Sequence, residues 1–385
     1  MGQQEQAQTQ QAKPAGPETQ QKEIDKLFTA SMKTGASDLH LKVGSPPLFR
    51  IHGQVVRAKL PPLTLNHIKQ LVGDIMGPKE VQSLEDVGAA DFAHGVKGVG
   101  RFRVNVFKQR GAISMAARRV QTDIPTIEQL NLPDGVKVIP TFEQGLCVVA
   151  GVTGSGKSTT LASLIEIMNQ TQALHIITIE NPIEYLYRDN KSFINQREIG
   201  LDCVSFYDGL KYAVRQDPDV ILVGEMRDED TVETALMAAE TGHVVFGTVH
   251  ASNAAGTIGR ILDFFPPTKH HQIRQLLFFN LKSIIVQKLL RGARPDVPRV
   301  PAVELMLVNP MIKKLIFEGE DNKIPDVIRA SREEGMQDIN QSLMDLVFRG
   351  LITEQVALES SPNPEQLAMN LKGITLGSDR GSLVS

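Results

Sequence analysis

The sequence predicts an α/β protein in which a smaller α+β module precedes a domain built on a parallel sheet. From Gly145 onwards strand-like, loop and helix-like segments alternate, which is typical of a parallel sheet. Before Gly145 the apolar runs are shorter and are interrupted by glycine and proline, which favours antiparallel strands. The buried strands of the parallel sheet are predicted from four apolar runs: Leu146–Ala150, Ile176–Ile179, Val220–Val223 and Val244–Thr248.

Composition limits the class of protein. The chain has 385 residues, of which 41% are hydrophobic and 22% charged, so it has room for two globular domains. Its net charge of −3 provides no general attraction to nucleic acid. The two cysteines, Cys147 and Cys203, provide neither a disulfide framework nor a zinc site, which favours a cytoplasmic setting. Because no apolar stretch approaches roughly 18 residues, we expect no membrane helix. The N-terminus has no apolar run either, so we expect no secretory signal.

The N-terminal part is predicted to contain a tail and a domain. Residues 1–22 are rich in glutamine and almost lack apolar side chains, so we expect a disordered tail. Residues 23–120 are predicted to form the α+β domain. Its expected elements are a first helix with Ile24, Leu27, Phe28 and Met32 on one face, strands Asp38–Val43 and Leu48–Ile51 with a turn at His52–Gly53, helices at 65–76 and 78–85, and strands Ala90–Ala93, Arg101–Phe107 and Ala112–Arg119.

The remaining chain is predicted to contain a linker, a core and a helical end. Three prolines mark residues 121–143 as a hinge or linker with a short helix, and the parallel-sheet core is expected over 144–290. Apolar spacing between Gln272 and Leu290 predicts one long helix. We expect a helical C-terminal region at 291–365 and a flexible tail at 366–385. Helices between the strands are predicted at Ser158–Asn169, Tyr207–Arg215 and Thr231–Ala239.

A phosphate-binding loop is predicted directly after the first strand of the core. Residues 151–158 read GVTGSGKS, which fits the pattern G-x-x-x-x-G-K-[ST] between a strand and a helix. Glycines let backbone N–H groups turn toward phosphates, and a helix N-terminus favours negative charge. We expect Lys157 to reach the β- and γ-phosphates of ATP and Ser158 to ligate Mg²⁺. The predicted nucleotide-binding residues are Gly151, Thr153, Gly154, Ser155, Gly156, Lys157, Ser158 and Thr159.

An acid for the metal is predicted after the strand Val220–Val223. Glu225 follows this strand, and ligands gather at the carboxyl ends of parallel strands. Asp217 and Asp219 precede the same strand and therefore fall at the opposite edge. We expect Glu225 to contact Mg²⁺, partly through water.

Two carboxylates follow the strand Ile176–Ile179. Glu180 ends this strand and Glu184 lies four residues further on. Either could act as general base for the attacking water. Position alone does not choose between them.

Histidines bracket the strand Val244–Thr248. His250 follows the strand, at the edge expected to carry Lys157 and Glu225, so it could sense the γ-phosphate. His243 precedes the strand, and the pattern assigns it no role. Four strands thus deliver polar side chains to one edge, which predicts an active site there.

These motifs resemble those of the secretion-ATPase superfamily and, within it, the type IV pilus retraction ATPases. The likeness extends from residue 23 to about 360 and includes boxes at 151–158, 180–185, 219–228 and 242–254. It implies an ATP-hydrolysing enzyme with a RecA-like core. It also implies that Glu184 is the catalytic base, that Glu225 is the acid of the metal box, and that the two catalytic box histidines are His243 and His250.

The resemblance implies an assembly as well. Residues 23–120 resemble a PAS-like domain, in which Arg101 and Arg103 match arginines that reach a neighbour's nucleotide. The family forms homohexamers that turn an inner-membrane platform protein of the pilus. A cytoplasmic protein peripheral to the inner membrane is therefore implied, with a paralogous retraction ATPase as a further partner and no nucleic acid.

Two features favour the retraction branch. The four zinc-binding cysteines of extension and type II secretion ATPases are missing, and residues 311–318 resemble the retraction-specific tail. Two positions depart from the family, since Asn181 replaces an aspartate, and Lys313 and Lys314 replace an arginine–asparagine pair. Because Glu184 remains, we expect ATP hydrolysis to survive.

Three alternatives stay open at this point. The first is a motor for pilus extension or type II secretion. The second is an accessory retraction subunit that binds ATP and supports an active partner, as Asn181 would allow. The third, a DNA translocase, would need a basic groove or an aromatic stacking platform, which four tyrosines and no tryptophan do not favour.

Overall fold

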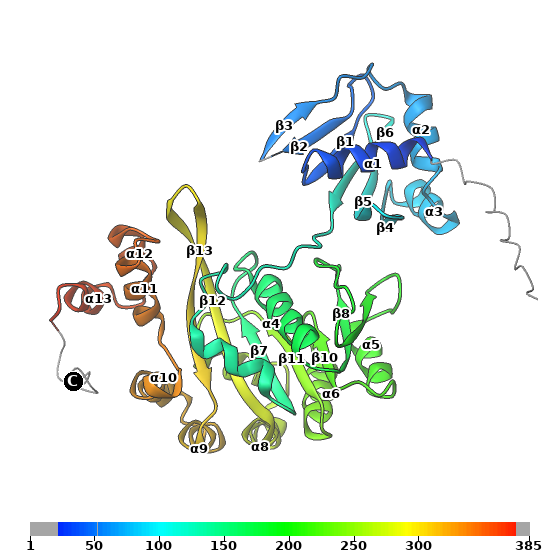
Figure 1. The fold of residues 1–385 in the computed structure, drawn as a ribbon. Coiled ribbons are helices and arrows are strands. Elements are labelled where there is room, and N and C mark those ends of the chain that lie inside the picture. Colours follow the sequence, from blue (N-terminus) through cyan, green and yellow to red (C-terminus); the bar gives the residue numbers. More distant parts are fainter. Residues whose placement is uncertain (1–21, 52, 375–385) are drawn as a thin grey trace, which may run out of the picture. The chain divides into compact units, whose positions relative to one another are not determined.

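The computed structural model describes residues 22–51 and 53–374 (Figure 1). The predicted tail at 1–21, residue 52 of the predicted turn, and residues 375–385 lie outside the described residues. The described chain divides into two compact units, the first ending at Val120 and the second beginning at Gln121. Each unit has its own hydrophobic core.

The first unit is an antiparallel sheet with three helices, in the strand order β3-β2-β1-β6-β5-β4. The apolar side of α1, including Ile24 and Phe28, packs into one core with Leu39 of β1, as its helical spacing predicts. Strand β3 was not predicted, because all of its residues are exposed. The elements are α1 Glu23–Lys33, β1 Asp38–Leu41, β2 Leu48–Ile51, β3 Gln54–Arg57, α2 Leu65–Gly73, α3 Pro78–Asp86, β4 Ala89–Val96, β5 Gly100–Gln109 and β6 Ala112–Arg119.

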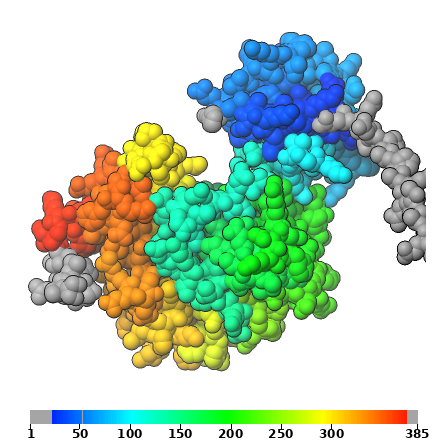
Figure 2. Space-filling view, in the orientation of Figure 1, coloured from blue at the N-terminus to red at the C-terminus, as the bar shows by residue number. Residues whose placement is uncertain are grey.

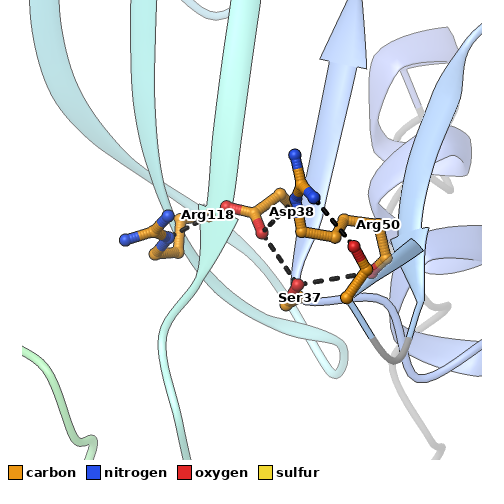
Figure 3. Close-up of polar contacts among 5 residues, drawn as sticks. Ser37, Asp38, Arg50 and Arg118 are labelled. Carbon is orange, nitrogen blue, oxygen red and sulfur yellow. Dashed lines mark hydrogen bonds and ion pairs between the residues drawn. The ribbon is translucent and has the colours of Figure 1, made fainter. Parts of the chain in front are cut away.

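A buried carboxylate ties three strands of this sheet together (Figure 3). Asp38 of β1 accepts hydrogen bonds from Ser37 at 2.7 Å and from Arg118 of β6 at 2.9 Å. Atom Nε of Arg50, on β2, lies 3.7 Å from Oδ2 of Asp38. Burial opposes ionisation, yet the hydrogen bonds from Ser37 and Arg118 hold the pKa of Asp38 below its usual value.

The second unit is built on a mixed sheet in the strand order β13-β12-β7-β11-β10-β8-β9. Strands β12, β7, β11, β10, β8 and β9 run parallel, and β13 pairs antiparallel with β12. The four predicted strands are therefore neighbours in one sheet. The strands are β7 Gly145–Ala150, β8 His175–Glu180, β9 Phe193–Glu198, β10 Val220–Val223, β11 Val244–Val249, β12 Leu281–Arg294 and β13 Val297–Leu307.

Alternate residues of these strands face two cores, one on each side of the sheet. In β7, Leu146 and Val148 pack with helices of one face, whereas Cys147 and Val149 pack with the apolar side of α4 on the other. Strands buried on both faces read as continuous apolar runs, which explains why they were visible in the sequence. The helices are α4 Lys157–Thr171, α5 Phe206–Ala213, α6 Glu229–Glu240, α7 Ala254–Leu262, α8 His270–Asn280, α9 Pro310–Glu318, α10 Ile324–Ala330, α11 Ile339–Phe348, α12 Glu354–Ser360 and α13 Pro364–Leu371.

The predicted long helix from Gln272 to Leu290 is wrong. Helix α8 ends at Asn280, and the chain continues into the hairpin of β12 and β13, whose yellow tip projects from the second unit (Figure 2). Ile284 faces one core and Ile285 faces the other, so β12 is buried on both sides. A short apolar run of this kind cannot be told from a buried helix by its periodicity. The predicted border at 290 therefore cuts a strand, and the region 291–365 begins with strand rather than helix.

Two further expectations about the ends of the core are corrected. Residues 121–143 contain the predicted short helix, a 3-10 helix at Asp134–Thr141. The segment is packed onto the core beside α4 through Ile127, Val136 and Ile139, so it is more than a linker. The predicted tail at 366–385 is helical at its start, where α13 places Leu367 in a small core with the β12–β13 hairpin and α11. Prolines suggested loops in the first case, but proline also fits the first turn of a helix and rigid packed turns.

Strand β9 of the second sheet was missed in addition to β12 and β13. Strand β9 lies at the sheet edge and carries Asn195, Gln196 and Arg197, so it lacks the apolar signal of a buried strand.

Among the described helices, none has both the length and the apolar character needed to span a bilayer.

Candidate active site

A cavity of about 440 Å³ opens at the carboxyl edge of the second sheet. Its walls come from the segments that follow four parallel strands: residues 153–159 after β7, 180–187 after β8, Gly224 and Glu225 after β10, and His250 after β11. Parallel strands bring their carboxyl ends to one edge, so residues far apart in sequence meet here. The predicted convergence of four polar segments is therefore present.

The loop after β7 has the geometry of an anion-binding loop. Gly154 and Gly156 adopt φ values of 77° and 95°, a backbone region in which side chains are strained. Gly156 is the N-cap of α4, so the N–H groups of the first helical turn are directed at the cavity. Gly151 is required for packing, because a Cβ there would lie 2.5 Å from the Gln287 carbonyl of β12.

The side chain of Lys157 lies in this loop and bonds to its backbone. Its ammonium donates hydrogen bonds to the carbonyls of Gly151 at 2.8 Å and Val152 at 3.1 Å. Burial lowers the pKa of Lys157, while Glu225 and Glu184 counteract this shift. If a phosphate enters the loop, the ammonium of Lys157 can exchange its hydrogen bonds to these two neutral carbonyl groups for hydrogen bonds to the phosphate.

Glu225 and His250 both line the cavity, and their side chains are in direct contact. Atom Nε2 of His250 lies 3.3 Å from Oε1 of Glu225, and Arg227 donates to Oε2 at 2.5 Å. The Glu225 side chain is 23% exposed and that of His250 is 46% exposed, so both can reach a ligand. The loop that carries Glu225 is fixed by Thr248 of β11, which donates to the Gly224 carbonyl at 2.6 Å.

The structure separates the two carboxylates that the sequence left open. Glu180 is buried and accepts hydrogen bonds from Thr178 at 2.6 Å and from Gln196 at 3.2 Å. Burial raises its pKa, and the backbone N–H of Glu184 is a further partner of its carboxylate. Glu180 thus supports the following loop, and it also lines the cavity. Glu184 lines the cavity with an exposed side chain, which leaves it available to a water molecule.

A tyrosine connects this loop to the phosphate-binding helix. The hydroxyl of Tyr185 lies 3.1 Å from Oγ1 of Thr159 on α4, and its carbonyl accepts from Gln196 of β9 at 2.8 Å. Thr159 therefore supports the loop of Glu184 from the side of α4. Neither contact could be found from the sequence, since the three residues lie on different elements.

Some predicted residues lie elsewhere. His243 lies at the amino end of β11, and its Nδ1 donates to the Ala238 carbonyl at 2.8 Å, so it does not line the cavity. Gly151 and Ser155 are buried beneath the loop and support its shape. Arg101 and Arg103 lie on β5 of the first unit, and their proposed contact with a neighbouring chain stays a prediction.

Two residues that sequence reasoning missed belong to the cavity. Leu289 of β12 and Arg299 of β13 line it from the hairpin. The hairpin was interpreted as helix, so neither residue could be placed next to the phosphate-binding loop. An arginine and a leucine on one wall are suited to contact the flat face of a nucleotide base.

Comparison with known proteins decides the family. A family model described as type II/IV secretion system protein matches residues 134–344, which include every strand of the second sheet. The chain belongs to this family. The matched residues include the segments that form the walls of the cavity. Together with the similar proteins, the match shows an ATP-hydrolysing enzyme.

Similar proteins include ATPases of the type IV pilus, one of which is named for pilus retraction. The type IV pilus retraction ATPase PilT of Pseudomonas aeruginosa is 42% identical over 343 residues, which cover 89% of this chain and 99% of that protein. The type IV pilus ATPase PilU of the same organism is 37% identical over 358 residues, which cover 93% and 92%. A crystal structure of the pilus retraction motor PilT with bound ADP is 46% identical, with a TM-score of 0.82 over 91% of this chain and 99% of that one.

Proposed function

We propose that this chain is a ring-forming motor that uses ATP hydrolysis to retract a type IV pilus. The observation that carries the proposal is the cavity at the carboxyl edge, where Lys157, Glu184 and Glu225 meet. Support for retraction comes from a relative of that name, which aligns over nearly the whole chain, and from the similar structure of a pilus retraction motor. The alignment does not favour the alternative of a pilus-extension or secretion motor.

The residues of the cavity divide the chemistry among them. Backbone N–H groups at the start of α4 and the ammonium of Lys157 stabilise the charge that develops on the transferred phosphoryl group. Glu184 accepts a proton from the attacking water and orients it. His250 contacts the γ-phosphate and transmits its presence to Glu225, to which it lies adjacent.

The donor set also fits Mg²⁺. Ser158 in the first turn of α4 and Glu225 line the same cavity, and hydroxyl and carboxylate oxygens are the ligands that this ion prefers. When bound, the ion neutralises charge on the β- and γ-phosphate oxygens. Residues Ser158 and Glu225 would hold it, the latter partly through water.

The assembly is part of the proposal. The first unit is a PAS-like domain, the second has a RecA-like core, and the chain forms a homohexamer. In that ring, Arg101 and Arg103 reach the nucleotide of a neighbour, where positive charge stabilises the transition state. The ring works in the cytoplasm at the inner membrane on the pilus platform protein, and a paralogous retraction ATPase is a further partner.

Substitution of Glu184 tests the chemistry. In the purified full-length chain, Glu184→Gln should lower kcat by a factor of about 10² to 10⁴, the usual contribution of a general base. The KM for ATP should change little, because the phosphate-binding loop is intact. The matched control is Glu240→Gln, an exposed acid at the far end of α6. Normal turnover in Glu184→Gln would remove this residue as the base.

Deletion of the gene tests the biological direction. A strain that lacks a retraction motor should carry an excess of surface pili and lose surface motility. A strain that loses its pili would show that the motor drives extension instead. Complementation with Glu184→Gln separates a need for hydrolysis from a need for the protein as a scaffold.

A further inference from the structure

The chain crosses from the first unit to the second at one peptide bond, between Val120 and Gln121. On the first side, the N–H of Val120 donates to the Arg101 carbonyl of β5 at 3.0 Å. On the second side, the N–H of Gln121 donates to the Glu184 carbonyl at 3.2 Å. The N–H groups of two consecutive residues, Val120 and Gln121, are therefore bonded to the backbone of Arg101 and of Glu184, the residue proposed as the base.

In the second unit, both the N–H and the carbonyl of Gln121 are bonded to the loop that carries Glu184. Leu186 donates its N–H to the Gln121 carbonyl at 2.8 Å, so hydrogen bonds to Gln121 flank Tyr185 on both sides. The hydroxyl of Tyr185 is held by Thr159. The loop of Glu184 is thus fixed between α4 and the first residue of the second unit.

The backbone position of this loop matters because the Glu184 side chain is exposed in the cavity. A general base must lie within about 3 Å of the proton that it accepts. A misplacement of about 1 Å can reduce catalysis by about 100-fold. An exposed side chain takes its position mainly from its backbone, and here that backbone is bonded to the connector between the units.

We propose that Gln121 is a positioning residue for Glu184, whose backbone bridge makes the proton-accepting step depend on the position of the connector. The inference rests on the proposed role of Glu184 as the base. With the bridge formed, the base faces the attacking water. With the bridge broken, nucleotide still binds, because the phosphate-binding loop is held separately by β7 and α4, but hydrolysis slows.

Replacement of one backbone donor tests this proposal. In the full-length chain, Gln121→Pro removes the N–H that binds the Glu184 carbonyl and keeps an extended backbone. Gln121→Ala is the matched control, because it keeps the N–H and removes only the side chain. We expect Gln121→Pro to lower kcat about tenfold or more while KM stays within about twofold, and Gln121→Ala to change neither. Equal kcat values for the two variants would overturn the proposal.

A second measurement does not depend on turnover. Amide hydrogen exchange of residues 184–188 should be faster in Gln121→Pro than in Gln121→Ala, whereas exchange in α4 stays the same. If the wild-type chain hydrolyses no ATP, the proposed function fails, and exchange alone still tests the bridge. Unchanged exchange at 184–188 overturns the proposal in either case. If the proline variant does not fold, two glycines inserted between Val120 and Gln121 replace it, with slower turnover expected and unchanged turnover contradicting the proposal.

Discussion

At the carboxyl edge of the seven-stranded sheet polar side chains face a cavity, whereas at the amino edge they bond to backbone groups of neighbouring strands and helices. His250 lies beside Glu225 in the cavity, but His243 donates to the Ala238 carbonyl. Asp219 accepts from the backbone N–H of His175 at 2.7 Å. The same residue types therefore serve a ligand at one edge and local structure at the other. Strand direction decides which role a residue has, because helices that follow the strands direct their N–H groups at the carboxyl edge.

The largest effect that this comparison predicts is at Lys157. Lys157→Ala removes the positive charge from the carboxyl edge and should lower kcat/KM for ATP by about 100-fold or more, as loss of one electrostatic donor does. Steady-state hydrolysis by the purified chain measures it. Lys191→Ala, an exposed lysine before β9, is the control. A fall of less than tenfold would mean that the edge binds phosphate through backbone groups alone.

The second prediction concerns a buried acid in the same sheet. Glu304 of β13 accepts the N–H of Ala254 at 2.7 Å, and burial raises its pKa from 4.5 to about 7. The N–H of Ala254 lowers this pKa and Asp338 raises it further. Between pH 4.5 and about 7, Glu304 therefore keeps its proton in the folded chain and has lost it in the unfolded chain. Ionisation of Glu304 thus removes stability as the pH rises toward 7.

Glu304→Gln should remove this pH dependence. Its free energy of unfolding should exceed that of the wild type at pH 8 by up to about 3 kcal/mol, and the gain should vanish toward pH 5. Urea unfolding at both pH values measures the difference. Glu359→Gln, an exposed acid that lines the same cavity of about 840 Å³ as Glu304, serves as control. A constant difference across this range would refute a titrating Glu304.

The two histidines that flank β11, His243 and His250, test the comparison directly. We expect His250→Ala to lower kcat by about tenfold, since it removes a group that faces the γ-phosphate. His243→Ala should mainly reduce stability by about 1 kcal/mol, the value of one hydrogen bond. Turnover and thermal unfolding of both variants measure this. Equal losses of kcat would give His243 the catalytic role that the family resemblance implies.

The smallest effect is expected at the hairpin wall. Arg299→Ala removes a side chain that lines the cavity, and should raise the KM for ATP about fivefold, which corresponds to a stacking contact of about 1 kcal/mol. The kcat should not change, because Arg299 is expected at the base rather than the phosphates. Arg299→Lys distinguishes planarity from charge. A fall in kcat with constant KM would place Arg299 near the reacting phosphoryl group instead.

Much of the site could be predicted because its signals are local. The loop 151–158 is continuous in sequence, and strands β7, β8, β10 and β11 are short apolar runs with turns at both ends. Residues after each run therefore fall at one edge, which was enough to bring Lys157, Glu225 and His250 together. The choice of Glu184 over Glu180 required the family resemblance and stays a prediction. In the structure Glu180 is buried and Glu184 is exposed.

The sequence by itself determined the phosphate-binding loop, the parallel strands behind it and the edge at which the chemistry occurs. Only the tertiary structure decided that residues 281–307 form a hairpin, because Ile284 and Ile285 are buried against different faces of the sheet. It also decided that Arg299 lines the cavity and that Gln121 is bonded to Glu184. Such contacts join residues far apart in the chain, and no local pattern of apolar or charged side chains specifies them.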